Sequence, residues 1–569
     1  MIVLSCMIPL YNKTEKEAQM NTPLNEYPRP QLERESYESL NGCWEYEIIG
    51  EKTMKGIINV PFPPESRKSG VQHIIKPDDT LIYRRNVEFK GDFNPDIDTL
   101  ILHFDAVDYE AIVMVDGKEE AHHYGGYLPF EIKLRKPSFS LEVIVKDPTD
   151  TEEIERGKQK LRHGGIWYTP ISGIWQSVWI EKVSEGYIER IKLEPELNGF
   201  YITAKTESHD ISLKLDGNEY ALTGNKREFI NIHSPHLWSP DDPYLYHFTL
   251  ETENDTVRSY VGLRTFGIDE RGMLLNGNPI YHHGILDQGY FEDGIYTPSS
   301  YNEMENDLLY IKSLGFNAIR KHIKIEPLRW YYYADTIGLL VWQDMINGGG
   351  NYKALTVKTP LVIGSFLNDR RNHKAFSRSS ALMMRRWEDN AESTIRHLYN
   401  STSIALWTIF NEGWGQFDSE RIKKKLESID SSRPYDADSG WHDQGLPPFK
   451  SEHVYFRKYR FRKDRKGRVV ILSEFGGYGL KIDAHSPDGK TFVYKRLRTK
   501  EELTAEIERL YEEEIIPAKK KGLAASIYTQ LSDVEEEVNG LITADRKEIK
   551  IIPQRIRKLS EKLINADNG

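Results

Sequence analysis

Residues 317–345, NAIRKHIKIEPLRWYYYADTIGLLVWQDM, carry two short apolar strand candidates on either side of a helical pattern. A strand, a helix and a second strand in that order predict a parallel βαβ unit. The same alternation begins at about Gly267, and it contains eight strand candidates: 280–286, 317–322, 339–345, 404–410, 434–440, 453–455, 469–474 and 524–530. Helical patterns lie between most of them, and we expect serine to cap the helix that follows Ser299-Ser300. Eight such units over about 300 residues predict a (β/α)8 TIM barrel.

The chain before the barrel has a different pattern, with short strand-like runs separated by Gly, Pro, Asp and Asn. Residues 21–183 predict a β-sandwich, within which Asp116-Gly117 is typical of a hairpin turn. Residues 184–266 have the length and strand density of an immunoglobulin-like β-sandwich. With a disordered tail over 1–20 and the barrel over 267–569, this division predicts a multidomain protein.

Composition narrows the class of protein. Hydrophobic residues make up 39% and charged residues 29% of the 569 residues, which is typical of a soluble globular chain. The net charge of −11 disfavours binding to nucleic acid or to an anionic membrane. Cys6 and Cys43 cannot build a disulfide framework or a cysteine metal site. No signal peptide or membrane-spanning run is found, so we expect a cytoplasmic protein.

The ends of the predicted barrel strands carry the chemistry, because TIM-barrel active sites lie at the C-terminal ends of the strands. Asn411-Glu412 follows the fourth strand and Glu474 ends the seventh. Both glutamates follow strongly apolar runs and precede glycine-containing turns, where a carboxylate is costly without a function. Two carboxylates at one barrel mouth predict glycoside hydrolysis, since one can protonate the leaving oxygen while the other attacks or activates water. A lyase or aldolase would instead need a Schiff-base lysine or a metal cluster at the strand ends.

Several segments resemble glycoside hydrolase family 2. SIALWTIFNEGW (403–414) looks like its acid/base segment, VVILSEFGG (469–477) like its nucleophile segment, and residues 316–345 like its second-to-third-strand block. Upstream segments such as GIWYTPISGIWQSVWIE (165–181) extend the resemblance over nearly the whole chain after Leu24. The resemblance implies a jelly-roll β-sandwich of the sugar-binding type, an immunoglobulin-like β-sandwich and a catalytic TIM barrel, in that order.

The activity implied is that of a retaining exo-β-glycosidase, with β-galactoside as the first substrate expected. β-Glucuronidase, β-mannosidase and α-L-arabinopyranosidase specificities are alternatives in the same fold, and a non-catalytic carbohydrate-binding protein is the alternative from another class. The Asn-x-Lys that glucuronidase members use to hold a carboxylate is not found near the end of the chain. A carbohydrate substrate is therefore the expected partner, and the sheet faces of the two sandwiches suit self-association into a homo-oligomer.

Roles carried over by the resemblance assign Glu412 as general acid/base and Glu474 as nucleophile of a double displacement. Asn411 would hydrogen-bond the sugar 2-hydroxyl, Arg320 would orient the nucleophile, and Tyr455 would donate a hydrogen bond to it. The other residues expected to contact the substrate are His322, Trp441, Trp414, Asp287 and Tyr528.

Other features have plainer interpretations. His282-His283 lack a third ligand and face opposite ways on a strand, so no metal site and no cofactor are expected. Trp167, Trp175 and Trp179 are expected in the core of the first sandwich. The run RKYRFRKDRKGR (457–468) holds eight Lys and Arg and is expected to be a solvated loop. A second hypothesis places this run on the barrel rim, where it would attract an anionic glycan.

Overall fold

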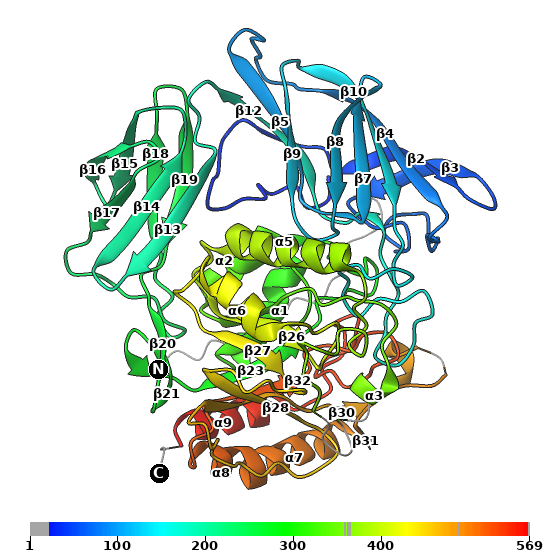
Figure 1. Ribbon diagram of the computed structural model, residues 1–569, viewed down its shortest axis with the longest axis vertical. Coiled ribbons are helices and arrows are strands. Elements are labelled where there is room, and N and C mark those ends of the chain that lie inside the picture. The colour runs from blue at the N-terminus through cyan, green and yellow to red at the C-terminus, as the bar shows by residue number, and fades with distance from the viewer. Residues whose placement is uncertain (1–21, 358–359, 361–365, 488, 567–569) are drawn as a thin grey trace.

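The computed structural model describes residues 22–357, 360, 366–487 and 489–566. Within them the chain forms two β-sandwiches and a parallel barrel, and Figure 1 shows the sandwiches side by side above the barrel. This architecture confirms the predicted multidomain fold. The predicted tail over 1–20 lies outside the described residues, and the four domain boundaries stay predictions.

The first sandwich packs a four-stranded sheet against a six-stranded sheet, with a core that includes Trp44, Leu102 and Val143. The four-stranded sheet runs in the order β1 (Tyr37–Ser39), β12 (Val178–Ser184), β5 (Asp98–Phe104) and β9 (Phe130–Leu134). The six-stranded sheet runs in the order β3 (Met54–Val60), β2 (Gly42–Ile49), β4 (Thr80–Glu88), β10 (Ser138–Lys146), β7 (Glu110–Val115) and β8 (Lys118–Tyr124). Asp116 and Gly117 join β7 to β8 with φ of 50° and 75°, the conformation of a two-residue hairpin turn, which confirms the predicted hairpin.

The second sandwich consists of a three-stranded and a four-stranded antiparallel sheet around Phe200, Leu213 and Phe248. The strands are β13 (Arg190–Glu196), β14 (Gly199–Lys205) and β17 (Arg227–Asn231) in one sheet, and β16 (Asn218–Thr223), β15 (Asp210–Leu215), β18 (Tyr246–Glu251) and β19 (Thr256–Val261) in the other. A short sheet of β20 (Phe266–Asp269), β21 (Gly272–Leu275) and β22 (Asn278–Pro279) then leads into the barrel.

The barrel is a parallel eight-stranded sheet, and all eight predicted strands belong to it. The strands are β23 (His282–Asp287), β24 (Ala318–Lys321), β25 (Leu340–Asp344), β26 (Ile404–Asn411), β27 (Tyr435–Ser439), β28 (Phe449–Val454), β29 (Val469–Gly476) and β32 (Ala525–Thr529). Strand β23 pairs with both β24 and β32, so the first and last strands meet. β27 and β28 lie at the two ends of the sheet, where the Ser451 hydroxyl donates to Asp436 Oδ2 at 2.7 Å.

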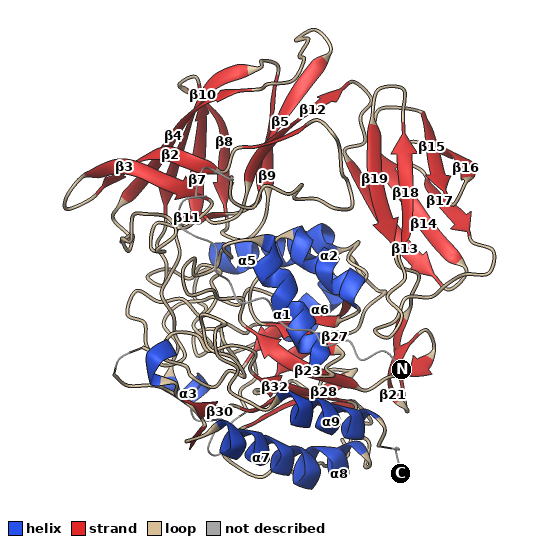
Figure 2. Cartoon of the chain, turned by 180° about the vertical axis from the view of Figure 1, so that it is seen from behind, coloured by secondary structure: helices blue, strands red, loops and turns tan. Residues whose placement is uncertain are grey.

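Helices surround this sheet (Figure 2). They are α1 (Tyr301–Ser313), α2 (Leu328–Ile337), α3 (Ala354–Val357), α5 (Ala381–Leu398), α6 (Ser419–Glu427), α7 (Lys500–Leu510), a π-helical turn (Tyr511–Ile515), α8 (Ile516–Lys519) and α9 (Pro553–Ile564). The prediction that a serine side chain caps α1 is wrong. Ser300 holds the N-cap position without a side-chain capping bond, and the Glu303 carboxylate instead accepts from the N–H of Ser299.

Strand alternation divides the barrel side chains into two sets. Leu286, Trp342, Leu406, Ile471 and Ile527 form one buried cluster that fills the interior, while their neighbours along the strands pack outward against the helices. No helix among the described residues is long and apolar enough to cross a membrane. The interior of the barrel is filled by these apolar side chains. The polar side chains at the next inward-facing positions lie at the C-terminal ends of the strands.

Candidate active site

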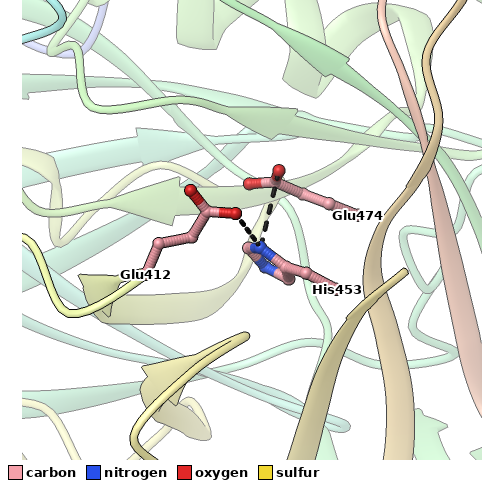
Figure 3. A group of neighbouring side chains, drawn as sticks. All are labelled: Glu412, His453 and Glu474. Atoms are coloured by element: carbon pink, nitrogen blue, oxygen red, sulfur yellow. Dashed lines mark hydrogen bonds and ion pairs between the residues drawn. The ribbon is translucent and has the colours of Figure 1, made fainter. Parts of the chain in front are cut away.

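Glu412, Glu474 and His453 come together at the C-terminal ends of β26, β29 and β28 (Figure 3). His453 Nδ1 lies 2.9 Å from Glu412 Oε1 and 3.5 Å from Glu474 Oε2, so one ring nitrogen faces both carboxylates. One carboxylate oxygen from each glutamate lies within 4.8 Å of the other. The two glutamates are only 7% and 6% exposed. The prediction that two strand-end carboxylates share one mouth therefore agrees with the geometry.

The backbone at the end of β26 turns sharply to present Glu412. Glu412 has φ of 50° and Gly413 has φ of 73°, and the Glu412 N–H donates to Ser439 O at 2.9 Å. A left-handed conformation is uncommon for glutamate and costs about 1–3 kcal/mol, a strain that clusters at functional sites. A side chain at Gly413 would lie 2.6 Å from His442, so this turn requires glycine.

Arg320 connects the acidic groups of the site from β24. Its guanidinium donates to Asp344 at 3.0–3.2 Å, to Glu474 Oε1 at 3.2 Å and to Asn411 Oδ1 at 2.8 Å. Its side chain is fully buried. Asp344 also accepts from His322 Nδ1 at 2.8 Å, which fixes the orientation of that ring. Arg320 thus holds the Glu474 carboxylate in place, as the resemblance implied.

Tyr455, one residue beyond the end of β28, contacts the other oxygen of Glu474. Its hydroxyl donates to Glu474 Oε2 at 2.5 Å and lies 3.0 Å from Thr529 Oγ1. Burial and the neighbouring Glu474 charge hold the pKa of Tyr455 well above its usual value, so the hydroxyl keeps its proton. Both oxygens of Glu474 are therefore held by donors.

The environments of the two glutamates shift their pKa values in opposite directions. Burial, reinforced by the negative charge of Glu474, raises the pKa of Glu412 above its ordinary value. Burial acts in the same sense on Glu474, but the positive charges near it, first His453 and then Arg320, outweigh burial and lower its pKa. The arrangement favours a protonated Glu412 beside an ionised Glu474.

Asn411 has a free hydrogen-bond donor. Its Oδ1 accepts from Arg320 NH2, which can only donate, so the amide orientation is fixed. Its Nδ2 is buried and has no hydrogen-bond partner among the described residues. A buried donor without a partner costs roughly 1–3 kcal/mol, and a bound ligand would satisfy it.

His453 is the site residue whose role the sequence reasoning missed. Its Nε2 lies 3.4 Å from Arg320 Nη1 and 3.1 Å from Ser439 Oγ. Its Nδ1 faces both carboxylates and can donate to either of them when it carries a proton. Its position in the stretch 453–455, two residues before Tyr455, places it on the same face of β28, which is the signal that could have revealed it.

Aromatic side chains flank this group. Trp441 lies 6.5 Å from the His453 ring, and Trp414 lies 6.2 Å from His322, between ring centroids. Burial lowers the pKa of His322 to about 4, so its ring is neutral at neutral pH. These three predicted residues therefore lie beside the acidic pair.

Trp167 is not in the core of the first sandwich as predicted. Trp175 is buried in the core cluster of the barrel, Trp179 is buried against the ring of His103, and neither belongs to the core cluster of the first sandwich. Trp167 is half-buried and its ring lies 5.2 Å from Trp414. Trp167 belongs to a loop of the first sandwich, residues 156–172, that extends over the barrel mouth. The Gly165 N–H donates to Glu536 Oε2 at 2.8 Å, which ties this loop to the segment after β32.

Asp287 and Tyr528 do not reach the acidic pair, and their expected substrate contacts are not supported. Asp287 is ion-paired with Lys321, whose ammonium lies 4.3 Å above the ring of Trp330 on α2, outside the barrel. Tyr528 packs outward against Phe475, at 5.7 Å between centroids. Side chains alternate along a strand, and both of these residues are at positions that point out of the barrel. Thr529, the next residue after Tyr528, points inward and contacts Tyr455 instead.

The basic run 457–468 does not lie along the rim. It descends the side of the barrel, since Phe461 lies against Gly522 just before the start of β32 and Arg468 pairs with Asp443 at 2.7 Å. The segment takes the place of a helix between β28 and β29, and all of its residues are described. The second hypothesis, that this run attracts an anionic glycan at the rim, is therefore wrong in its location.

Metal ligation by the acidic group would cost existing hydrogen bonds. Glu412, His453 and Glu474 offer ligand atoms within 4.8 Å of one another, which is the composition of a cation site. The same atoms already bond to one another, to Arg320 and to Tyr455. His282 and His283 face opposite ways, toward Trp342 and Ser560 respectively. The absence of a metal stays a prediction.

A TIM barrel with two close carboxylates at the ends of its fourth and seventh strands is typical of glycoside hydrolases. Models of glycosyl hydrolases family 2 match residues 189–264, and the model of the TIM barrel domain of that family matches residues 266–466. The chain belongs to glycosyl hydrolases family 2 and is related to β-galactosidases and β-glucuronidases.

Individual relatives are distant. A β-galactosidase of Staphylococcus xylosus is 25% identical over 357 residues, which are 58% of this chain and 33% of that protein. This chain thus spans about a third of the length of that relative. The fold is similar to a galacturonate-bound family 2 β-galacturonidase from Eisenbergiella tayi (TM-score 0.71, 19% identity, 96% of this chain and 100% of that one). It is also similar to a β-D-glucuronidase from Dictyoglomus thermophilum (TM-score 0.73, 18% identity, 95% and 100%).

Proposed function

We propose that the protein is a retaining exo-β-glycosidase in which Glu474 is the nucleophile and Glu412 the general acid/base. The observation that carries this proposal is the pair of buried carboxylates at the ends of β26 and β29, whose surroundings raise the pKa of Glu412 and lower that of Glu474. Retaining enzymes place their carboxyl groups about 5–5.5 Å apart, whereas inverting enzymes leave about 6.5–9.5 Å for a water molecule. Oxygens within 4.8 Å of each other support the retaining geometry.

In the first step Glu474 attacks the anomeric carbon while Glu412 gives its proton to the departing glycosidic oxygen. The bond from Glu474 to the sugar forms as the glycosidic bond breaks, and the nucleophile loses its negative charge. The pKa of Glu412 then falls, because Glu474 no longer repels its ionised form. Ionised Glu412 next removes a proton from water, which attacks the anomeric carbon and releases Glu474.

Neighbouring groups support these steps. Asn411 Nδ2 is the free donor for the sugar 2-hydroxyl, a contact that strengthens as positive charge develops on the ring. Arg320 and Tyr455 keep Glu474 ionised before attack and stabilise it as the leaving carboxylate in the second step. His453 Nδ1 lies 2.9 Å from Glu412 and 3.5 Å from Glu474, a position from which it can donate to whichever carboxylate carries the charge.

Removal of the Tyr455 hydroxyl tests this assignment. We expect Tyr455→Phe to lower kcat about tenfold to a hundredfold, because a hydrogen bond to a charged group contributes about 1.5–3 kcal/mol. The acid limb of the pH profile should move upward, since the pKa of Glu474 rises when a donor is lost. Tyr459→Phe is the matched control, because Tyr459 donates to Glu452 at 3.1 Å away from the site. Equal effects of the two substitutions would contradict the role of Tyr455.

Hydrolysis of nitrophenyl glycosides tests the function itself. The panel should hold the β-galactoside, β-glucoside, β-glucuronide, β-galacturonide, β-mannoside and α-L-arabinopyranoside. We expect hydrolysis of at least one β-glycoside with net retention, followed by NMR of the first-formed sugar anomer. Binding of sugars without turnover of any substrate would favour the alternative of a carbohydrate-binding protein, and an α-anomer formed first from a β-glycoside would exclude retention.

A further inference from the structure

The loop 156–172 of the first sandwich brings cations to the barrel mouth. Arg156 is 2% exposed and donates to the carbonyl oxygens of Gly349 and Gly350, so its guanidinium is held by neutral groups. Lys158 follows two residues later and is 9% exposed. Neither side chain forms an ion pair with a carboxylate of the described residues.

Lys158 makes fewer polar contacts than Arg156. Its ammonium makes no hydrogen bond to any described residue, and its contacts are the rings of Tyr168 at 5.7 Å and Trp414 at 5.8 Å. Lysine is almost never buried without a partner, because taking an ammonium out of water costs several kcal/mol. Two rings at nearly 6 Å offset only a part of this cost. The structure therefore holds, at the barrel mouth, a largely buried lysine whose ammonium has no hydrogen-bond or ion-pair partner among the described residues.

The position of Lys158 connects it to the proposed reaction centre. Trp414, whose ring it faces, lies two residues after Glu412 and packs beside His322. The charge of Lys158 lowers the pKa values of Glu412, Glu474 and His322, which shows that its ammonium is near all three. A sugar seated over the acidic pair would thus present a ring substituent to Lys158.

We propose that Lys158 binds an anionic substituent of the sugar, a carboxylate or a sulfate, and that the substrate is therefore an acidic β-glycoside. The proposal rests on the proposed function, since it concerns the substrate of the same site. A neutral hydroxyl would accept one hydrogen bond from the ammonium but would not form an ion pair with it, as a carboxylate or sulfate would. Arg156 adds a second positive charge on the same side without a carboxylate partner.

Substrates that differ only in charge test this proposal. The β-galactoside is compared with the β-galacturonide and the 6-sulfated β-galactoside, and the β-glucoside with the β-glucuronide. We expect kcat/KM for an acidic member to exceed that of its neutral partner about tenfold to a hundredfold, which is the effect of one charge-assisted hydrogen bond. The preferred acidic member shows whether the group recognised is a carboxylate or a sulfate.

Lys158→Met keeps the length of the side chain and removes its charge. We expect this substitution to abolish most of the acidic preference, mainly through KM, and to leave the thermal midpoint unchanged or raised because a buried unpaired charge is lost. Lys463→Met is the matched control on the exposed basic run 457–468 and should preserve the preference. A lysine that only supports the fold would instead give a lower thermal midpoint and an unchanged preference.

The outcomes separate this proposal from the proposed function. Glu474-dependent hydrolysis in which neutral members equal or exceed acidic ones would overturn the role of Lys158 and leave the glycosidase assignment standing. Without turnover of any substrate, calorimetry with galacturonate, glucuronate and galactose 6-sulfate decides the matter. Binding that Lys158→Met abolishes supports the anionic site even if the catalytic proposal fails, and no binding overturns it.

Discussion

Glu474→Ala is expected to lower kcat roughly 10⁴-fold or more on every β-glycoside that the protein hydrolyses. The substitution removes the group that we propose forms the bond to the anomeric carbon, and no other carboxylate of the described residues accepts from both Tyr455 and Arg320. The space it leaves can admit a small anion. Azide should then restore turnover and give an α-glycosyl azide, because it attacks from the face that Glu474 occupied.

The matched control for this experiment is Glu452→Ala. Glu452 lies on the neighbouring strand β28, and its carboxylate accepts from Tyr459 on the outer side of the barrel. This control should retain most of the activity. Full activity of a folded Glu474→Ala protein, or a β-glycosyl azide as the rescued product, would rule out Glu474 as the nucleophile.

Glu412→Ala should have a different signature, because general acid catalysis contributes about 10²–10⁴-fold and matters most for poor leaving groups. Formation of the glycosyl-enzyme from an activated aryl glycoside should proceed nearly normally, while its hydrolysis becomes rate-limiting. A burst of nitrophenol followed by a slow phase is the expected observation. Azide should accelerate the slow phase and give a β-glycosyl azide, since it attacks the intermediate from the face that water normally uses.

The pH dependence of kcat/KM tests the role of Glu412 independently. In the proposed mechanism Glu412 acts as an acid, so kcat/KM should fall as the pH rises through its pKa, and burial beside Glu474 moves that limb upward. Glu412→Gln cannot ionise and should flatten the alkaline limb, whereas Glu420→Gln on the exposed α6 should leave it unchanged. An alkaline limb that persists in Glu412→Gln would assign it to another group.

The barrel and the acidic pair were predictable because both depend on local patterns. Apolar runs followed by helical periodicity define the eight strands, and Glu412 and Glu474 stand where two of those runs end. Tyr528 and Asp287 could not be assigned correctly from position alone. A strand end tells where the mouth is but not which of two successive residues faces inward, and the correct parity selects Thr529 rather than Tyr528.

Other features depend on contacts between distant parts of the chain. Trp167 and Lys158 belong to a sandwich that precedes the barrel by about a hundred residues, so no local pattern indicates that their loop reaches Trp414. The basic run 457–468 showed the opposite problem. Its charge pattern was clear in the sequence, but its path along the barrel side depends on the missing helix between β28 and β29.

The loop 156–172 also bears on how such an enzyme diversifies. The two glutamates to which we assign catalysis, and the groups that hold them, lie in the barrel, whereas Lys158 and Trp167 lie in a loop of the first sandwich. Mutations in that loop can change which glycan binds without changing the two glutamates or the residues that hold them. Exchange of this one loop, rather than redesign of the barrel, is accordingly the shortest route by which evolution or protein engineering would change the substrate of this enzyme.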